Sequence, residues 1–226
     1  MDRICEPELM DDQAQALAYA AADFSAGDRA VVERFAALST PRPGDALLDL
    51  GCGPGNISFR LAEQFPQVRV LGVDGAAAML QIARARLDRA PGRWPVLAFS
   101  HGLLGPAGLA PRPPDRFMGL ISNSLLHHLH EPGVLWDALP LLAAPGAAVL
   151  VRDLRRPASP EAVQALLLQH LADAPPVLQR DYVASLHAAF SVDEVRQQLV
   201  VAGLADQLQV AELDDRYLEV WGCLAG

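Results

Sequence analysis

Hydrophobic and polar residues alternate along residues 44–156 in a way that predicts repeated strand–helix units. Short aliphatic runs are separated by longer segments with apolar residues on one helical face, as Ile57, Leu61 and Phe65 are. Strands are expected at 46–50, 68–73, 96–99, 117–121 and 147–151, and helices between them at 56–65, 76–87 and 134–142. Such alternation predicts a parallel sheet flanked by helices.

Two further segments depart from this alternation. Residues 102–115 are so rich in glycine and proline that they cannot form a regular helix, and we expect a loop there. Residues 160–189 are helical in pattern and longer than a simple crossover needs. Ser191 and Glu194 then fit a capping box, which predicts a helix that runs to about Ala202.

The C-terminal part of the chain predicts a last pair of strands, at 208–211 and 217–224. The five residues between them are too few for a parallel crossover, so the pair should form an antiparallel hairpin. The fold class is therefore α/β, with a doubly wound seven-stranded sheet and a C-terminal antiparallel hairpin. We expect one domain over 1–226, made of a helical cap at 1–40, a core at 44–156, a helical insertion or lid after strand five at 157–190, and the last helix with the hairpin at 191–226.

Composition and charge narrow the classes of function. Of the 226 residues, 51% are hydrophobic and 20% are charged, as in a folded globular protein. The net charge is −9, and all 18 basic residues are arginine, so lysine chemistry such as a Schiff base is excluded. We expect no nucleic-acid partner, because nonspecific binding to phosphates requires many basic residues.

The N-terminal sequence and the cysteines bear on the compartment. Residues 1–12 lack the charged-then-apolar layout of a secretion signal, and no stretch approaches the 18 uninterrupted apolar residues of a membrane span. Cys5, Cys52 and Cys223 lie far apart, without metal-ligand or redox spacing, which favours reduced thiols. We expect a cytoplasmic protein without a membrane span, and its oligomeric state stays open.

The most informative motif joins the first strand to the next helix. Asp49 precedes three glycines at alternate positions, Gly51, Gly53 and Gly55. Glycines allow a tight turn and the close approach of a ligand, and the start of the helix leaves free N–H groups that point at that ligand. Asp74 closes the next strand, where an acid can accept hydrogen bonds from both hydroxyls of a ribose.

Two classes of cofactor use this geometry. The dinucleotide fingerprint needs glycine or alanine at its sixth position, where this chain has Asn56, and a carboxylate before the glycines would repel a pyrophosphate. The observed order, D-x-G-x-G-x-G, resembles instead the class I S-adenosylmethionine-dependent methyltransferases, of the small-molecule type. In that family the glycine loop holds the methionine part of the cofactor, and the preceding acid, here Asp49, lies near its ammonium group. The resemblance covers roughly 44–156 by motif, which makes this the cofactor-binding core, and the terminal hairpin by topology.

A second match follows the fourth strand, in the sequence Ile-Ser-Asn-Ser-Leu-Leu-His-His-Leu at 121–129. It is similar to the segment that lies beside the transferable methyl group in these enzymes. Many relatives carry an acid after strand three that binds the adenine amino group, but residues 100–104 contain none, so we expect adenine to meet the backbone of 102–104 and the side chains of Met79 and Leu103. The resemblance implies these cofactor-binding residues: Asp49, Gly51, Cys52, Gly53, Gly55, Asn56, Asp74, Gly75, Met79, Gly102, Leu103, Asn123 and Ser124.

His127 and His128 are the candidate catalytic residues. Methyl transfer from a sulfonium mainly needs alignment, and a general base matters only where the acceptor must lose a proton early. Either histidine could serve as that base, and the alternative is that the pair only caps a helix or packs. We expect no metal, because magnesium-dependent relatives place acids at strand ends, where this chain has Ser122 and Asn123.

The candidate acceptor-binding residues are Tyr19, Arg156 and Tyr182. Tyr19 lies near the end of the first helical segment and Tyr182 in the insertion, two places where relatives contact the acceptor. Arg156 follows strand five together with Arg152 and Arg155, and an arginine at the carboxyl end of a strand could hold an acidic acceptor. A solvated loop is the favoured interpretation of these three arginines.

The helical pieces at 11–24 and 160–189 are rich in alanine and leucine and could close over a pocket, so we expect a small-molecule acceptor. The predicted function is transfer of a methyl group from S-adenosylmethionine to that acceptor by in-line displacement. The alternatives are an NAD-dependent oxidoreductase, which Asn56 and the terminal hairpin disfavour, and a non-catalytic methyltransferase-like binding module. The sequence leaves open the acceptor and which of its atoms is methylated.

Overall fold

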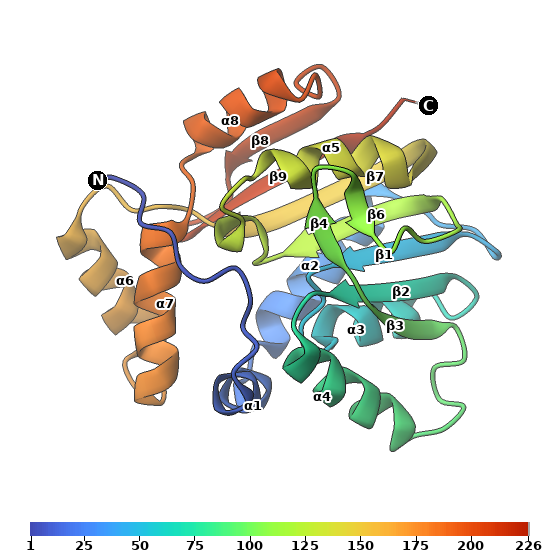
Figure 1. The fold of residues 1–226 in the computed structure, drawn as a ribbon, viewed down its shortest axis with the longest axis horizontal. Helices are drawn as coiled ribbons and strands as arrows, with labels where there is room; N and C mark the ends of the chain where they lie inside the picture. Colours follow the sequence, from blue (N-terminus) through green and yellow to red (C-terminus); the bar gives the residue numbers. More distant parts are fainter. Residues whose placement is uncertain (226) are drawn as a thin grey trace.

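A computed structural model describes residues 1–225, and seven of their strands form one sheet in the order β3–β2–β1–β6–β7–β9–β8 (Figure 1). The parallel strands are β1 (Ala46–Leu50), β2 (Arg69–Asp74), β3 (Leu97–His101), β6 (Phe117–Asn123) and β7 (Ala143–Leu154). The chain runs outward from β1 to β3 and then crosses back to β6, so the strand order reverses between β1 and β6. The carboxyl ends of strands at such a reversal form the crevice where doubly wound sheets bind ligands.

The C-terminal hairpin extends the sheet beyond β7. Strand β9 (Tyr217–Cys223) is antiparallel both to β7 and to β8 (Leu208–Glu212), with Tyr217 opposite Leu154. The doubly wound sheet with its antiparallel hairpin is therefore confirmed. Because β9 runs against β7, the residues that precede β9 lie at the same edge of the sheet as the end of β7.

Helices cover both faces of the sheet (Figure 1). One face carries α2 (Ser25–Leu38), α3 (Asn56–Gln64) and α4 (Ala77–Asp88), and the other carries α5 (Gly133–Leu142) and α8 (Val192–Val201). Leu47 packs against Phe35 on the first face, whereas its neighbour Leu48 belongs to the cluster around Trp136 on the second. Adjacent strand residues point to opposite faces, so β1, which is buried along its whole length, contributes to both cores.

The predicted helical insertion consists of two helices, α6 (Pro160–Leu171) and α7 (Pro176–Ala188). The break between them coincides with two consecutive prolines, Pro175 and Pro176, whose missing N–H groups prevent a continuous helix. Helix α7 contacts α1 (Gln13–Ala21), so the insertion and the N-terminal cap meet in space (Figure 1).

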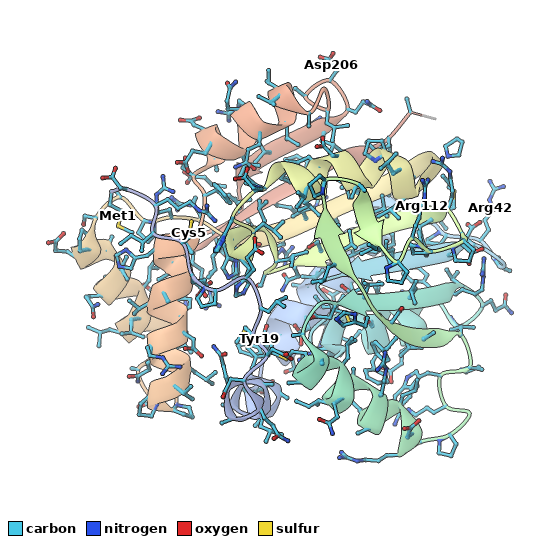
Figure 2. All side chains as sticks on the ribbon, viewed as in Figure 1. Met1, Cys5, Tyr19, Arg42, Arg112 and Asp206 are labelled. Atoms are coloured by element: carbon cyan, nitrogen blue, oxygen red, sulfur yellow. The ribbon has the colours of Figure 1, made fainter. Side chains whose placement is uncertain are left out.

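Residues 1–12, which we call the N-terminal strap, contain neither helix nor strand. Arg3 fastens the strap by donating hydrogen bonds to the carbonyls of Ala188 (2.6 Å), His127 (3.0 Å) and Leu129 (2.9 Å). Figure 2 places Met1 and Cys5 of the strap at one end of the molecule, near α6 and α7, and Arg42, which precedes β1, at the opposite end. The strap therefore lies at the end of the molecule where the parallel strands finish.

The expectation of a plain loop at 102–115 was wrong in part. Within it, β4 (Leu103–Gly105) and β5 (Gly108–Ala110) form a small antiparallel hairpin that packs against α5. Gly108 has a φ of +88°, which glycine adopts without strain, and this permits the tight return. Strands of three residues are too short to produce a readable alternation of polar and apolar residues.

None of the helices within residues 1–225 is long and apolar enough to cross a membrane.

Candidate functional site

The carboxyl ends of the central strands open into a cavity of about 590 Å³. The strap, α1 and α7 border it on the side away from the sheet, through residues such as Leu9, Tyr19 and Tyr182. The predicted site residues that line the cavity are Tyr19, Asp49, Gly51, Cys52, Gly53, Asn56, Asp74, Gly75, Met79, Gly102, Leu103, Asn123, Ser124, His127, His128 and Tyr182.

Two predicted site residues, Gly55 and Arg156, are not part of that lining. A Cβ atom on Gly55 would come within 2.7 Å of the Phe99 ring, so glycine is needed here for packing. The Arg156 guanidinium binds Glu194 (2.6 Å) and the carbonyl of Ala189 (2.9 Å), which ties β7 to the start of α8. These bonds hold Arg156 away from the cavity, so the structure does not support its predicted contact with the acceptor.

The glycine loop is held against the end of β2 by hydrogen bonds. The N–H groups of Gly51 and Cys52 both donate to the carbonyl of Val73, at 2.8 and 3.0 Å. The Asp74 carboxylate accepts from the N–H of Gly53 (2.7 Å) through one oxygen and from the N–H of Ala76 (2.7 Å) through the other. A carboxylate can accept further bonds at each oxygen, so Asp74 stays available to ligand hydroxyls while it fixes the loop.

Asp49 is a buried carboxylate that accepts a hydrogen bond from the Ser58 hydroxyl at 2.5 Å. Burial raises the pKa of Asp49 to about 7, and the nearby carboxylates of Asp74 and Asp28 add to this effect while Ser58 opposes it. The pKa values of Asp28 and Asp74 are raised too, chiefly by burial. Three crowded acids at one cavity wall favour a positively charged ligand, and the ammonium and sulfonium groups of S-adenosylmethionine meet that requirement.

The cavity wall beyond Asp74 is lined by apolar side chains. A Cβ atom on Gly75 would fall within 2.8 Å of both Leu103 and Leu9, so these two leucines from distant parts of the chain meet over this glycine. Met79 of α4 is buried in the same wall. The arrangement suits an aromatic base such as adenine, and Leu9 is a contribution of the strap that sequence reasoning missed.

His127 is buried at the end of β6, in the short helix η1 (Leu126–His128). Its Nδ1 is hydrogen-bonded to Asp153 at the end of β7, and the other oxygen of Asp153 accepts from the N–H of Leu126 (2.6 Å). Burial alone would lower the pKa of His127, but the carboxylates of Asp153 and Glu6 outweigh it, so the pKa is raised. Asp153 thereby orients the ring, as a carboxylate does for a catalytic or metal-bound histidine.

His128 stacks on His127 with ring centroids 4.2 Å apart, and its pKa is lowered to about 3 by burial and by the charge of its neighbour. Glu6 of the strap approaches both rings, at 3.4 Å from His127 Nε2 and 3.4 Å from His128 Nδ1. One ligand atom from each of these three side chains lies within 4.8 Å of the others, close enough to hold a metal ion. The expectation that no metal is needed stays a prediction.

Aromatic and charged groups from the helical cap and the insertion also line the cavity. Tyr19 packs against Phe24 (ring centroids 4.8 Å apart), and burial raises the pKa of its hydroxyl above the usual value. Tyr182 and Asp181 of α7 face them, together with Arg216 from the turn before β9. Sequence reasoning missed Arg216, because the run that contains it indicated only a hairpin turn.

Comparison with known proteins agrees with this geometry. The family model described as a methyltransferase domain matches residues 47–146. A trans-aconitate 2-methyltransferase of Methylobacterium radiotolerans is 39% identical over 116 residues, which are 51% of this chain and 39% of that protein. An uncharacterized methyltransferase of Mycobacterium tuberculosis is 32% identical over 111 residues, 49% of this chain and 51% of the relative. The matches thus span about half of these relatives or less.

Solved structures share the whole architecture at low sequence identity. A methyltransferase described as S-adenosylmethionine-dependent, from Aquifex aeolicus, covers 95% of this chain and 99% of its own with a TM-score of 0.64 and 16% identity. The plantazolicin methyltransferase BpumL, in complex with S-adenosylhomocysteine and a pentazolic desmethylPZN analogue, covers 95% of this chain and 90% of its own, with a TM-score of 0.66 and 11% identity. These likenesses extend the agreement from the matched segment to the fold.

The matched segment and the seven-stranded sheet with its terminal hairpin point to one class of protein. Residues 47–146 match the methyltransferase domain family, and the chain has the fold of solved S-adenosylmethionine-dependent methyltransferases. Members of one fold act on unrelated acceptors, so the acceptor has to be argued from the cavity.

Proposed function

We propose that this protein transfers a methyl group from S-adenosylmethionine to a small-molecule acceptor by in-line displacement. One observation carries the proposal: Asp49, the glycine loop and Asp74 line the same cavity as His127, Tyr19 and Tyr182. A cofactor held at the first group would direct its methyl toward an acceptor held at the second. Such an arrangement supplies the alignment on which methyl transfer depends.

The roles of the cofactor-side residues follow from their chemistry. Asp49 would accept hydrogen bonds from the ammonium group, Asp74 would accept them from the ribose hydroxyls, and Leu103 would pack on the adenine with Leu9. S-adenosylmethionine, when bound, supplies an activated methyl group on a sulfonium whose departure leaves a neutral thioether. The chain's own task is to orient the two reactants and to exclude water between them.

His127 is the side chain best placed to move a proton. Asp153 holds its Nδ1, so Nε2 is the nitrogen free to face a substrate, and it currently faces Glu6. An acceptor that must lose a proton would use this Nε2 as its base, whereas a carboxylate acceptor would need none.

The cavity supports a small acceptor rather than a polymer. The strap, α1 and α7 cover it, and the strap and α7 contribute apolar side chains such as Leu9 and Leu178. Several of the sequence relatives are named for trans-aconitate, which is itself a small molecule.

The three free cysteines, Cys5, Cys52 and Cys223, fit a reducing cytoplasm.

Binding and turnover measurements test the proposal. Calorimetry should detect binding of S-adenosylmethionine and S-adenosylhomocysteine but not of NAD. Asp74→Ala should weaken cofactor binding by about 1–3 kcal/mol, because the two hydrogen bonds from the ribose hydroxyls to the Asp74 carboxylate are lost. A coupled assay for S-adenosylhomocysteine should then report turnover with a member of a small-acid panel that includes trans-aconitate. Tight NAD binding, or no binding of either S-adenosyl compound, would overturn the proposal.

A further inference from the structure

Arg216 lies at the far end of the cavity from the glycine loop. It immediately precedes Tyr217, the first residue of β9, which pairs with Leu154 at the end of β7. The sheet order places β9 three strands away from β1 (Figure 1), a separation of roughly 14 Å at the usual strand spacing. Arg216 is therefore on the acceptor side of the cavity.

No acid within residues 1–225 forms an ion pair with the Arg216 guanidinium. Three arginines near the end of β7 are paired with acids: Arg152 with Glu219 (2.9 Å), Arg155 with Glu212 (3.5 Å) and Arg156 with Glu194 (2.6 Å). The Arg216 guanidinium lies beside the Tyr182 hydroxyl and 4.9 Å from the centre of the Tyr217 ring. A half-buried cation that lines a cavity without a paired acid favours the binding of an anion there.

Tyr182 of α7 adds a second unsatisfied donor at the same place. Its hydroxyl is buried and lacks a hydrogen-bond partner within the described chain. Burial raises the pKa of Tyr182 to about 12, an effect that the neighbouring Arg216 opposes, so the phenol keeps its proton at neutral pH. Buried hydroxyls normally have partners, so the missing one is expected to come from a ligand.

We propose that Arg216 and Tyr182 together bind a carboxylate group of the methyl acceptor. This inference rests on the proposed function, because it assigns a substrate class to the same cavity. A carboxylate has two oxygens and one negative charge, which match one guanidinium and one phenol. Asp181 and Asp28, which line the same cavity, would repel a phosphate dianion about twice as strongly as a singly charged carboxylate. The carboxylate anchors the acceptor, and the atom that receives the methyl group lies between this anchor and the cofactor.

Matched acids and amides test the charge requirement. Benzoate and hexanoate are titrated by calorimetry into protein saturated with S-adenosylhomocysteine, alongside benzamide, hexanamide and phenyl phosphate. We expect the two carboxylates to bind at least about ten times more tightly than their amides, since a hydrogen bond to a charged group is lost. Equal binding of acid and amide, no binding of any carboxylate, or tighter binding of phenyl phosphate than of benzoate would each overturn the inference.

Substitutions test whether Arg216 and Tyr182 are the residues that bind the carboxylate. Arg216→Gln should weaken benzoate binding by about tenfold, and Tyr182→Phe by about threefold, without altering affinity for S-adenosylhomocysteine. Arg196→Gln is the matched control, because Arg196 is exposed on α8, outside the cavity, and pairs with Asp193. Arg216→Lys keeps the charge but loses the planar fork, so a loss of several-fold remains measurable if the glutamine variant does not fold. Unchanged benzoate binding in either Arg216 variant contradicts the inference, whereas failure of the parent protein to bind S-adenosylhomocysteine contradicts the proposed function instead.

Discussion

Asp49 lies where the strand ends and the glycine loop begins, and its burial gives it an unusual titration. The raised pKa means that the folded protein holds a proton on Asp49 between about pH 4 and pH 7, whereas the unfolded chain releases it. Asp49 therefore lowers the stability of the empty protein as the pH rises through this range. A cationic ligand reverses the balance, because it favours the ionised carboxylate.

Affinity for S-adenosylmethionine should accordingly rise by about tenfold between pH 5.5 and pH 7.0, where the ligand's ammonium group remains protonated. Calorimetry in buffers of different ionisation enthalpy should also detect proton release on binding. Asp49→Asn removes the titrating group and should flatten both effects. A pH-independent affinity in the parent protein would show that Asp49 does not contact the cofactor's charge.

Local sequence spacing predicted which residues meet at the glycine-loop end of the cavity but only part of the rest of its lining. Asp49 and Asp74 were predictable because each lies at the end of a strand beside the glycine loop. The sequence of that loop by itself specifies the turn that lines the cavity. Arg216 was not predictable, since its position depends on β9 pairing with β7, and its own neighbours indicated only a turn. Arg156 was wrongly expected in the cavity because the sequence does not reveal its bond to Glu194.

Among the elements, the N-terminal strap changes the interpretation of the histidine pair. The Ser185 hydroxyl of α7 donates a hydrogen bond to Glu6 of the strap (3.0 Å). The Glu6 carboxylate also approaches a ring nitrogen of each histidine. Burial raises the pKa of Glu6, while His127 lowers it. The pKa of His127 is raised, because the carboxylates of Asp153 and Glu6 outweigh the effect of burial, so a proton competes with any metal ion for its ring.

We therefore expect protein treated with a chelator to retain its affinity for S-adenosylhomocysteine and, once an acceptor is known, its rate. The measurement compares turnover before and after treatment with EDTA, with and without added Zn²⁺ or Mg²⁺. Glu6→Gln serves as a companion variant, because a metal site would lose a ligand in it. Activity that is lost to EDTA and restored by one of these ions would make Glu6, His127 and His128 a metal centre.

The main helices and strands were predictable because their apolar residues recur at regular spacing. The recurrence arises because the helices pack one side against the sheet and the strands are buried within it. Residues 46–50 form a strand with the expected bounds, and the capping box of Ser191 and Glu194 is present. The β4–β5 hairpin and the strap were not predictable, since both are too short or too irregular to carry a period. Their positions are set by contacts with α5, η1 and α7.

For the whole molecule, ligand binding and stability are linked through the cavity that α1, α7 and the strap cover. S-adenosylhomocysteine at about 100 times its Kd should add about 2.7 kcal/mol to the free energy of unfolding. For a chain of this length the Tm should rise by about 5–10 °C. Differential scanning calorimetry measures the shift, and Asp74→Ala should show a smaller one at the same concentration. NAD at that concentration should leave the Tm unchanged, and a shift with NAD would contradict the assignment of the site.

The bonds of Arg3 also set an order of events during synthesis. The carbonyl of Ala188 that Arg3 binds is translated 185 residues later. At 5–20 residues per second, roughly ten to forty seconds pass between the two. Throughout that interval the nascent chain can complete β1 and the glycine loop, but the bond that ties the strap to α7 cannot form. A ribosome-bound chain that stops short of α7 would therefore lack one of the elements that border the cavity.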